Sequence, residues 1–161
     1  MPVQTAPEPI QARELTLTRL IDAPRAKLFR AWTEPELIKQ WFTPPPWKTI
    51  AAEMDVRAGG SSCITMQGPD GTKMPCPGVY LEVIKNEKLV FTDAFTKAWE
   101  PSNKAFMVGT ITFEDTPGGK TRYTARVQHW SVADREAHEQ MGFHPGWDIA
   151  TDQLAALAAK L

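Results

Sequence analysis

Apolar and polar residues alternate through the middle of the chain, and this alternation predicts a series of β-strands. A first strand is predicted over residues 14–21, followed further along by strands over 48–57, 61–67, 74–84, 89–95, 104–114 and 120–130. Turn residues separate them, most clearly Gly68-Pro69-Asp70-Gly71 and Asp115-Thr116-Pro117-Gly118-Gly119. Consecutive strands at such short spacing favour one curved antiparallel sheet.

Helical signals lie on both sides of this series of strands. Asp22 and Pro24 mark the start of one helix, and Thr33 with Glu36 has the spacing of a capping box, which predicts two short helices between about residues 24 and 41. Ser131 marks a further start, and residues 142–146 are predicted to interrupt that helix. Beyond the interruption, one helical stripe is apolar or small: Trp147, Ala150, Thr151, Leu154, Ala158 and Leu161.

The order of these elements predicts an α+β fold in which a long C-terminal helix packs on a curved sheet. One helix cannot cover the whole concave face of such a sheet. The uncovered part is therefore either filled by large side chains or left as an apolar cleft. Residues 1–13 are rich in proline and lack periodicity, so we expect a flexible leader before a single domain over 14–161.

Composition limits the possible partners. The 161 residues include 18 Lys and Arg and 19 Asp and Glu, a balance that gives no support for nucleic-acid binding. No apolar run is long enough to span a membrane, and the first residues lack the pattern of a secretory signal, so we expect no membrane partner. The 2 cysteines, Cys63 and Cys76, are too few for a disulfide framework, which predicts reduced thiols and a cytoplasmic location. The 6 tryptophans must line a core, a cavity or an interface.

Several short segments follow one another in an order typical of a known family. They include Ile21-Asp22-Ala23-Pro24, Ala31-Trp32-Thr33-Glu34-Pro35-Glu36-Leu37, Asp55-Val56-Arg57-Ala58-Gly59-Gly60, Gly78-Val79-Tyr80-Leu81-Glu82-Val83 and Gly146-Trp147. This set resembles the bacterial family similar to the activator of heat-shock protein 90 ATPase, within the SRPBCC (START-like, Bet v 1-like) superfamily. The resemblance implies a helix-grip fold with a mostly hydrophobic cavity between helix and sheet, and it leaves the ligand open.

Aromatic and aliphatic side chains are the candidates for lining this cavity, with methionines as adaptable additions. The predicted set is Trp41, Trp47, Met54, Met66, Tyr80, Phe91, Trp99, Ile111, Phe113, Tyr123, Val127, His129, Phe143, Trp147 and Leu154. Trp99 lies on a predicted loop and is a candidate gate at the mouth. His129 shares the odd positions of its strand with Tyr123 and Val127, so it is predicted to face inward, where it either orients a ligand, transfers a proton or is a satisfied structural residue.

The charged clusters have plainer interpretations. Asp55 and Arg57 precede a Gly-Gly turn, which predicts an exposed ion pair. Tyr80 and Glu82 share one side of a strand, and the apolar residues between and around them favour an outward direction for that side. An inward direction would make Glu82 a partly buried carboxylate. The histidines near the C-terminus lack the His-Glu-x-x-His spacing, so neither a metal nor another cofactor is predicted.

Three functions remain open at this stage. The favoured one is binding of a small hydrophobic or aromatic molecule, with no catalytic residue assigned. The second is an enzyme of the polyketide cyclase, aromatase or hydrolase type, which would use His129 or Glu82. The third is a chaperone-linked interaction module with Trp99 and the Pro44–Pro46 loop at its surface. The co-chaperone that names the family has an additional N-terminal domain with no counterpart here, so we do not expect direct ATPase activation. A homodimer through a sheet edge is also possible.

Overall fold

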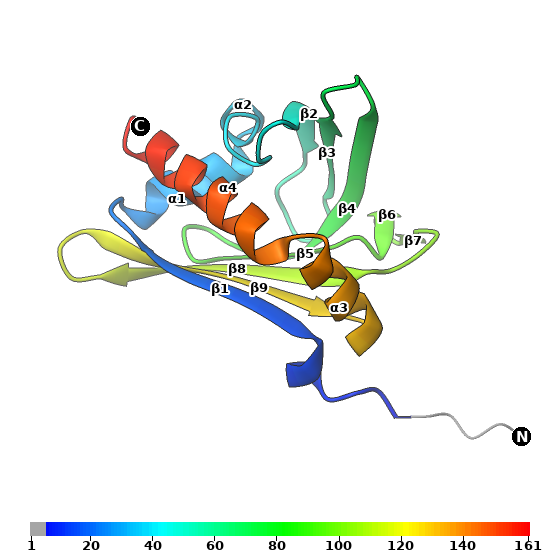
Figure 1. Cartoon of the computed structure of the whole chain (residues 1–161). Coiled ribbons are helices and arrows are strands. Elements are labelled where there is room, and N and C mark those ends of the chain that lie inside the picture. Colours follow the sequence, from blue (N-terminus) through cyan, green and yellow to red (C-terminus); the bar gives the residue numbers. More distant parts are fainter. Residues whose placement is uncertain (1–5) are drawn as a thin grey trace, which may run out of the picture.

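The computed structural model describes residues 6–161, and its main feature is a seven-stranded antiparallel sheet (Figure 1). The strand order is β1-β9-β8-β5-β4-β3-β2. The strands are β1 (Glu14–Ile21), β2 (Lys48–Met54), β3 (Ser61–Gln67), β4 (Lys73–Ile84), β5 (Lys88–Thr92), β8 (Met107–Thr116) and β9 (Lys120–His129). A separate small hairpin joins β6 (Phe95–Lys97) to β7 (Glu100–Pro101) in the predicted loop after β5.

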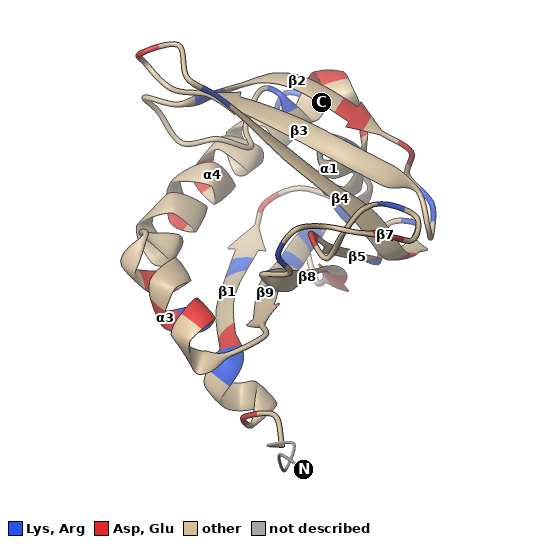
Figure 2. Cartoon of the chain, turned by 90° about the vertical axis from the view of Figure 1, so that its right-hand side faces the viewer, with Lys and Arg blue, Asp and Glu red and all other residues tan. Residues whose placement is uncertain are grey.

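The sheet bends strongly, and the helices lie on its concave side. Strands β2, β3 and β4 rise away from the layer that β1, β9 and β8 form (Figures 1 and 2). The helices are α1 (Arg25–Thr33), α2 (Pro35–Ile38), α3 (Val132–Gln140) and α4 (Phe143–Ala158). Helix α4 crosses the concave face, with α1 and α2 beside it (Figure 1). This arrangement confirms the predicted α+β helix-grip fold.

The alternation in β9 predicts the two faces of the sheet correctly. Tyr123, Ala125 and Val127 are fully buried, whereas Arg122 and Arg126 on the opposite face are exposed. The stripe on α4 meets this inner face, and its buried members are Ala150, Thr151, Leu154 and Ala158. The apolar stripe of the helix therefore packs on the apolar face of the sheet, as its helical spacing requires.

The helix ends differ in detail from the predictions. Ser131 does cap α3, since its Oγ accepts the N–H of Asp134 at 3.0 Å. Of the interruption predicted over 142–146, only the first residue, Gly142, is outside a helix, because α4 already begins at Phe143. Gly142 makes the break with a φ of 96°, a conformation that favours glycine. The predicted capping box at Thr33 is wrong: the Thr33 hydroxyl instead donates to the carbonyl of Phe29 within α1.

The segment before β1 is more regular than the sequence predicts. Residues 1–5 of the predicted leader lie outside the described residues, and Ile10–Arg13 form a 3-10 helix, η1. The Arg13 guanidinium donates to the carbonyl of His129 at 2.9 Å, and the carboxylate of Glu8 accepts the N–H of Val132 at 3.0 Å. Polar contacts to the end of β9 and the start of α3 hold this segment, so apolar periodicity carried no signal for it.

A β-bulge in β4 changes which side chains face inward. The register with β5 shifts between Tyr80 and Glu82, so one extra residue, Leu81, stands opposite the partner strand. Tyr80 and Val83 both pack on the core, whereas Glu82 faces outward and its carboxylate lies 3.3 Å from the ammonium of Lys88. The prediction that Tyr80 and Glu82 share one side is therefore wrong.

Candidate binding pocket

A pocket of about 130 Å³ lies where β4 parts from β5. Strand β4 pairs with β3 from Lys73 to Val79 but with β5 only from Val79 to Ile84, so its first half diverges from β5. Helices α1 and α2 cover the resulting space with Trp32 and Ile38. The remaining lining residues are Ser62, Ile64, Cys76, Pro77, Gly78, Val79, Tyr80, Phe91, Thr92, Asp93 and Met107.

Aromatic rings form much of the wall and are held in place. The ring centroids of Trp32 and Phe91 are 5.9 Å apart, and Trp32 also meets Trp41 edge-to-face at 5.0 Å. The Trp32 indole N–H donates to the hydroxyl of Tyr123 at 3.2 Å. Because the buried indole is fixed by packing and by a hydrogen bond, this side of the pocket is formed before any ligand arrives.

Phe91 owes its position to a glycine on the neighbouring strand. A Cβ added at Gly109 of β8 would lie 2.5 Å from Cε2 of the Phe91 ring, closer than any real contact. The ring of Phe91 therefore lies directly over the backbone of β8, and the space beside it remains available to the pocket.

The polar groups of the pocket are few, and most are already engaged. The Thr92 hydroxyl donates to the carbonyl of Met107 at 2.8 Å. Burial raises the pKa of the Tyr80 hydroxyl, against a smaller opposing effect of its hydrogen bond to Ser62. Burial likewise raises the pKa of the Cys76 thiol. Both groups are thus uncharged at neutral pH, and the pocket is mainly apolar.

The pocket opens to solvent beside the first half of β4, where Cys76 and Pro77 are exposed. A second hollow of about 230 Å³ adjoins it at Ser62. That hollow carries the carboxylates of Glu53 and Asp55 and lacks aromatic walls. Asp55 also forms the predicted exposed ion pair, 2.8 Å from the Nε of Arg57. The first pocket is therefore the better site for an apolar molecule.

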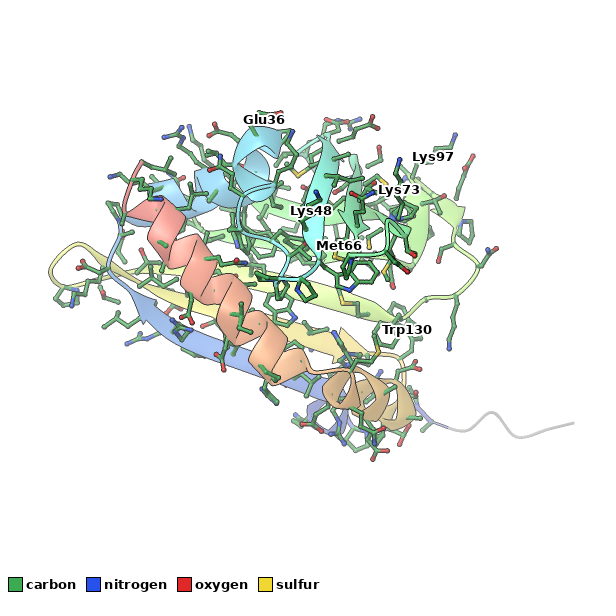
Figure 3. The ribbon with its side chains drawn as sticks, turned by 45° about the horizontal axis from the view of Figure 1, so that its top comes forward. Glu36, Lys48, Met66, Lys73, Lys97 and Trp130 are labelled. Atoms are coloured by element: carbon green, nitrogen blue, oxygen red, sulfur yellow. The ribbon has the colours of Figure 1, made fainter. Side chains whose placement is uncertain are left out.

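The structure brings only part of the predicted cavity set to this pocket. Tyr80 and Phe91 line it, and Trp41 and Trp147 stand behind Trp32. The others lie elsewhere. The main core contains Ile111, Phe113, Tyr123 and Leu154, and a smaller cluster contains Val127 and Phe143. Met54 lies at the core margin and in the second hollow, Trp47 lies against Gly68, and Met66 is half-buried on β3 (Figure 3). Trp99 is 61% exposed on the β6–β7 hairpin and does not line the pocket, so its predicted role as a gate has no support.

His129 is buried but also does not line the pocket. Its Nδ1 lies 2.8 Å from the carbonyl oxygen of Arg13, and its Nε2 lies 2.9 Å from Nδ1 of His138. Burial, together with the neighbouring His129, lowers the pKa of His138 to about 4. The satisfied structural role is thus the one observed, because α3 and η1 cover this end of β9. Glu82 faces outward and His129 is enclosed, so neither of the two residues named in the enzyme hypothesis lines the pocket.

Sequence reasoning missed several residues of the pocket, chiefly Trp32, Ile64 and Asp93. Trp32 belongs to an apolar pair with Leu28 in a short helix, and nothing in that pair distinguishes core from pocket wall. Asp93 offered a usable signal, since a carboxylate interrupts the apolar strand predicted over 89–95.

Within residues 6–161, no group of three His, Cys, Asp or Glu side chains is placed to hold a metal ion. No helix in the described part is long and apolar enough to cross a membrane.

A curved sheet around a C-terminal helix, with an apolar pocket beneath α1 and α2, defines a helix-grip protein. Residues 22–159 match the model of the Activator of Hsp90 ATPase homolog 1-like protein family, and the chain belongs to this family. It is similar to protein NE0264 from Nitrosomonas europaea, with 38% identity over 92% of this chain and 96% of that chain and a TM-score of 0.89. A comparison with curated proteins gives no match.

More distant solved structures share the fold. Protein Ms6760 from Mycobacterium smegmatis is 24% identical, with a TM-score of 0.77 over 97% of this chain and 96% of that chain. A protein from Rhodobacter sphaeroides is 20% identical, with a TM-score of 0.82 over 97% of this chain and 99% of that chain. These relatives support the architecture, and the use of the pocket has to be argued from its own residues.

Proposed function

We propose that the protein binds a compact apolar molecule, about the size of one aromatic ring, in the pocket at the split between β4 and β5. The observation that carries this proposal is the apolar pocket of about 130 Å³ with Trp32 and Phe91 in its wall. An apolar cavity of about 150 Å³ holds one benzene molecule, whereas sites for drug-sized ligands occupy about 300–1,000 Å³. The pocket therefore suits a ring or a short chain rather than a whole lipid.

The wall offers a ring favourable contacts at a small ordering cost. Trp32 is only 4% exposed and is anchored to Tyr123, so its side chain loses little freedom when a ligand binds. Ile64 and Phe91 are half-buried, and a ligand would remove their remaining apolar surface from water. The main contribution to affinity is thus the burial of apolar surface on both the ligand and the pocket wall.

Toluene and benzyl alcohol are suitable probes, with binding followed by amide chemical shifts and by the melting temperature. Ile64→Trp should fill the pocket and abolish binding. Leu20→Trp adds a similar bulk at a side chain that is 60% exposed on β1, and should leave binding unchanged. Cys76→Trp, at the exposed mouth, should block entry even if the Ile64 variant fails to fold.

The expected result is a saturable shift that is centred on Trp32 and Phe91 in the wild type and in the Leu20 variant, together with stabilisation that grows with probe concentration. Shifts of equal size in the Ile64→Trp and Cys76→Trp variants would place the probes elsewhere and overturn the proposal. The absence of any saturable shift with either probe would overturn it as well.

A further inference from the structure

The geometry points to a preference of this pocket for ring compounds that carry a positively charged amine, with the Asp93 carboxylate recognising the charge. This inference rests on the proposed function and names the class of ligand for the same site. It starts from the described residues that line the pocket. Asp93 is the one acidic side chain among these lining residues, and they include no Lys, Arg or His.

Asp93 is held at a fixed place on the edge of the pocket. It directly follows β5, and its Oδ1 accepts the backbone N–H of Phe106 at 2.9 Å and of Met107 at 3.1 Å. Among the described residues, Oδ2 has no hydrogen bond, and no basic side chain lies within 4.0 Å of the carboxylate. One carboxylate oxygen is therefore available to accept a hydrogen bond from a ligand.

The other ionisable groups of the pocket do not balance this charge. Burial raises the pKa of Tyr80 and of the Cys76 thiol, and for Cys76 the nearby Cys63 and Asp93 add to the effect. Both groups are thus neutral at pH 7. The lysine nearest along the chain, Lys97 on β6, lies 3.6 Å from the carboxylate of Glu100 and points away from the molecule (Figure 3). The pocket therefore carries a net negative charge.

The aromatic walls also favour a positively charged ligand. Trp32, Tyr80 and Phe91 all line the pocket, and a cation within about 6 Å of an aromatic face is attracted by the ring's electron density. A carboxylate ligand would be repelled both by Asp93 and by these faces. A ring with a short aminoalkyl arm would place its apolar part against Trp32 and Phe91 and its ammonium group at Asp93, where it would replace the water that a half-buried carboxylate loses.

Three probes of similar size and different charge test this inference: benzylamine, benzyl alcohol and benzoate. Dissociation constants would be measured at pH 7 and low ionic strength from amide chemical shifts. We expect benzylamine to bind about five- to tenfold more tightly than benzyl alcohol, and benzoate to bind most weakly. Added salt should reduce the advantage of benzylamine, since it screens a partly exposed charge.

Asp93→Asn is the decisive variant, because the asparagine Oδ1 can still accept both backbone N–H groups. It should remove the advantage of benzylamine and leave the affinity for benzyl alcohol unchanged. Asp22→Asn is the matched control, since Asp22 is an exposed carboxylate at the opposite end of the sheet, next to Ile21, which pairs with Thr121. This control should retain the full ranking of the three probes.

The outcomes separate the two proposals. If benzyl alcohol binds but benzylamine binds no more tightly, charge recognition is overturned while ring binding stands. The same conclusion follows if Asp93→Asn keeps the advantage of benzylamine. If none of the three probes binds, the proposed function itself fails. Should the asparagine variant not fold, the wild-type ranking and its dependence on salt give the result.

Discussion

The indole Nε1–H of Trp32 donates a hydrogen bond to the hydroxyl of Tyr123, with 3.2 Å between nitrogen and oxygen. Trp32 lies on α1 and Tyr123 on β9, and the two side chains are 4% and 0% exposed. The bond connects helix α1 to strand β9, next to the edge strand β1. It also fixes the orientation of the ring that forms one wall of the pocket.

Removing this bond should destabilise the protein. Tyr123→Phe leaves the buried indole N–H without a partner, and we expect a loss of about 1–2 kcal/mol in the free energy of unfolding. Urea denaturation would measure it. A double-mutant cycle with Trp32→Phe separates the pair interaction from the packing of each ring. If the cycle gives no coupling energy, the hydrogen bond does not fix the wall in the way described here.

The glycine beneath Phe91 should control the size of the pocket. Gly109→Ala forces the Phe91 ring away from β8, so we expect a cost of about 1–3 kcal/mol in stability and weaker binding of toluene. Gly146→Ala is the matched control. It lies within α4 with open space around an added Cβ, so it should stabilise by about 0.5–1 kcal/mol and leave binding unchanged. Equal toluene affinity in the two variants would contradict the role assigned to Gly109.

The pair formed by buried His129 and half-buried His138 has a definite proton arrangement when both rings are neutral. The carbonyl of Arg13 can only accept, so His129 carries its proton on Nδ1, and its Nε2 accepts a hydrogen bond from the Nδ1–H of His138. Glu139 follows His138 in α3, and its carboxylate lies 2.8 Å from the guanidinium of Arg135 and 3.5 Å from the imidazole of His144. A second proton on the pair would place two positive charges within one partly buried contact.

Stability should therefore fall in mild acid. The pKa of His138 is lowered to about 4 in the folded protein, below its ordinary value of 6.5, so the unfolded chain takes up the proton first. The free energy of unfolding is therefore unaffected by protonation of His138 above about pH 6.5, and it falls progressively as the pH drops towards 4. Melting temperatures between pH 8 and pH 4 would show the decline.

The variant His138→Asn keeps a hydrogen-bond donor near the Nδ1 position but does not titrate. It should show a smaller decline in melting temperature than the wild type across the same pH range. His144→Asn removes the neighbouring half-exposed histidine and should retain most of the wild-type decline. If the wild type and the His138 variant gave parallel curves, the histidine pair would not be the source of the acid sensitivity.

Local periodicity determined most of the fold. The odd positions of β9, from Tyr123 to Val127, are inward because a strand alternates its side chains, and the α4 stripe from Ala150 to Ala158 is inward because helical spacing places these residues on one face. Both patterns are properties of the chain over a few residues. The order of the elements then allowed little other than a curved sheet around a terminal helix.

The site depended on relations that no local pattern contains. The bulge at Leu81 placed Tyr80 inward while Glu82 stayed outward, because one extra residue breaks the alternation that would have put both on one side. The pocket exists because β4 pairs with β5 only from Val79 onward. Trp32 covers the pocket because Tyr123, distant in sequence, holds the indole. Trp99 and Trp32 are alike as residues, yet one lies on an exposed hairpin and the other forms the wall. The sequence by itself thus determined which residues are inside, and the tertiary structure decided which of them face an open space, since that depends on how well distant segments fill the volume between them.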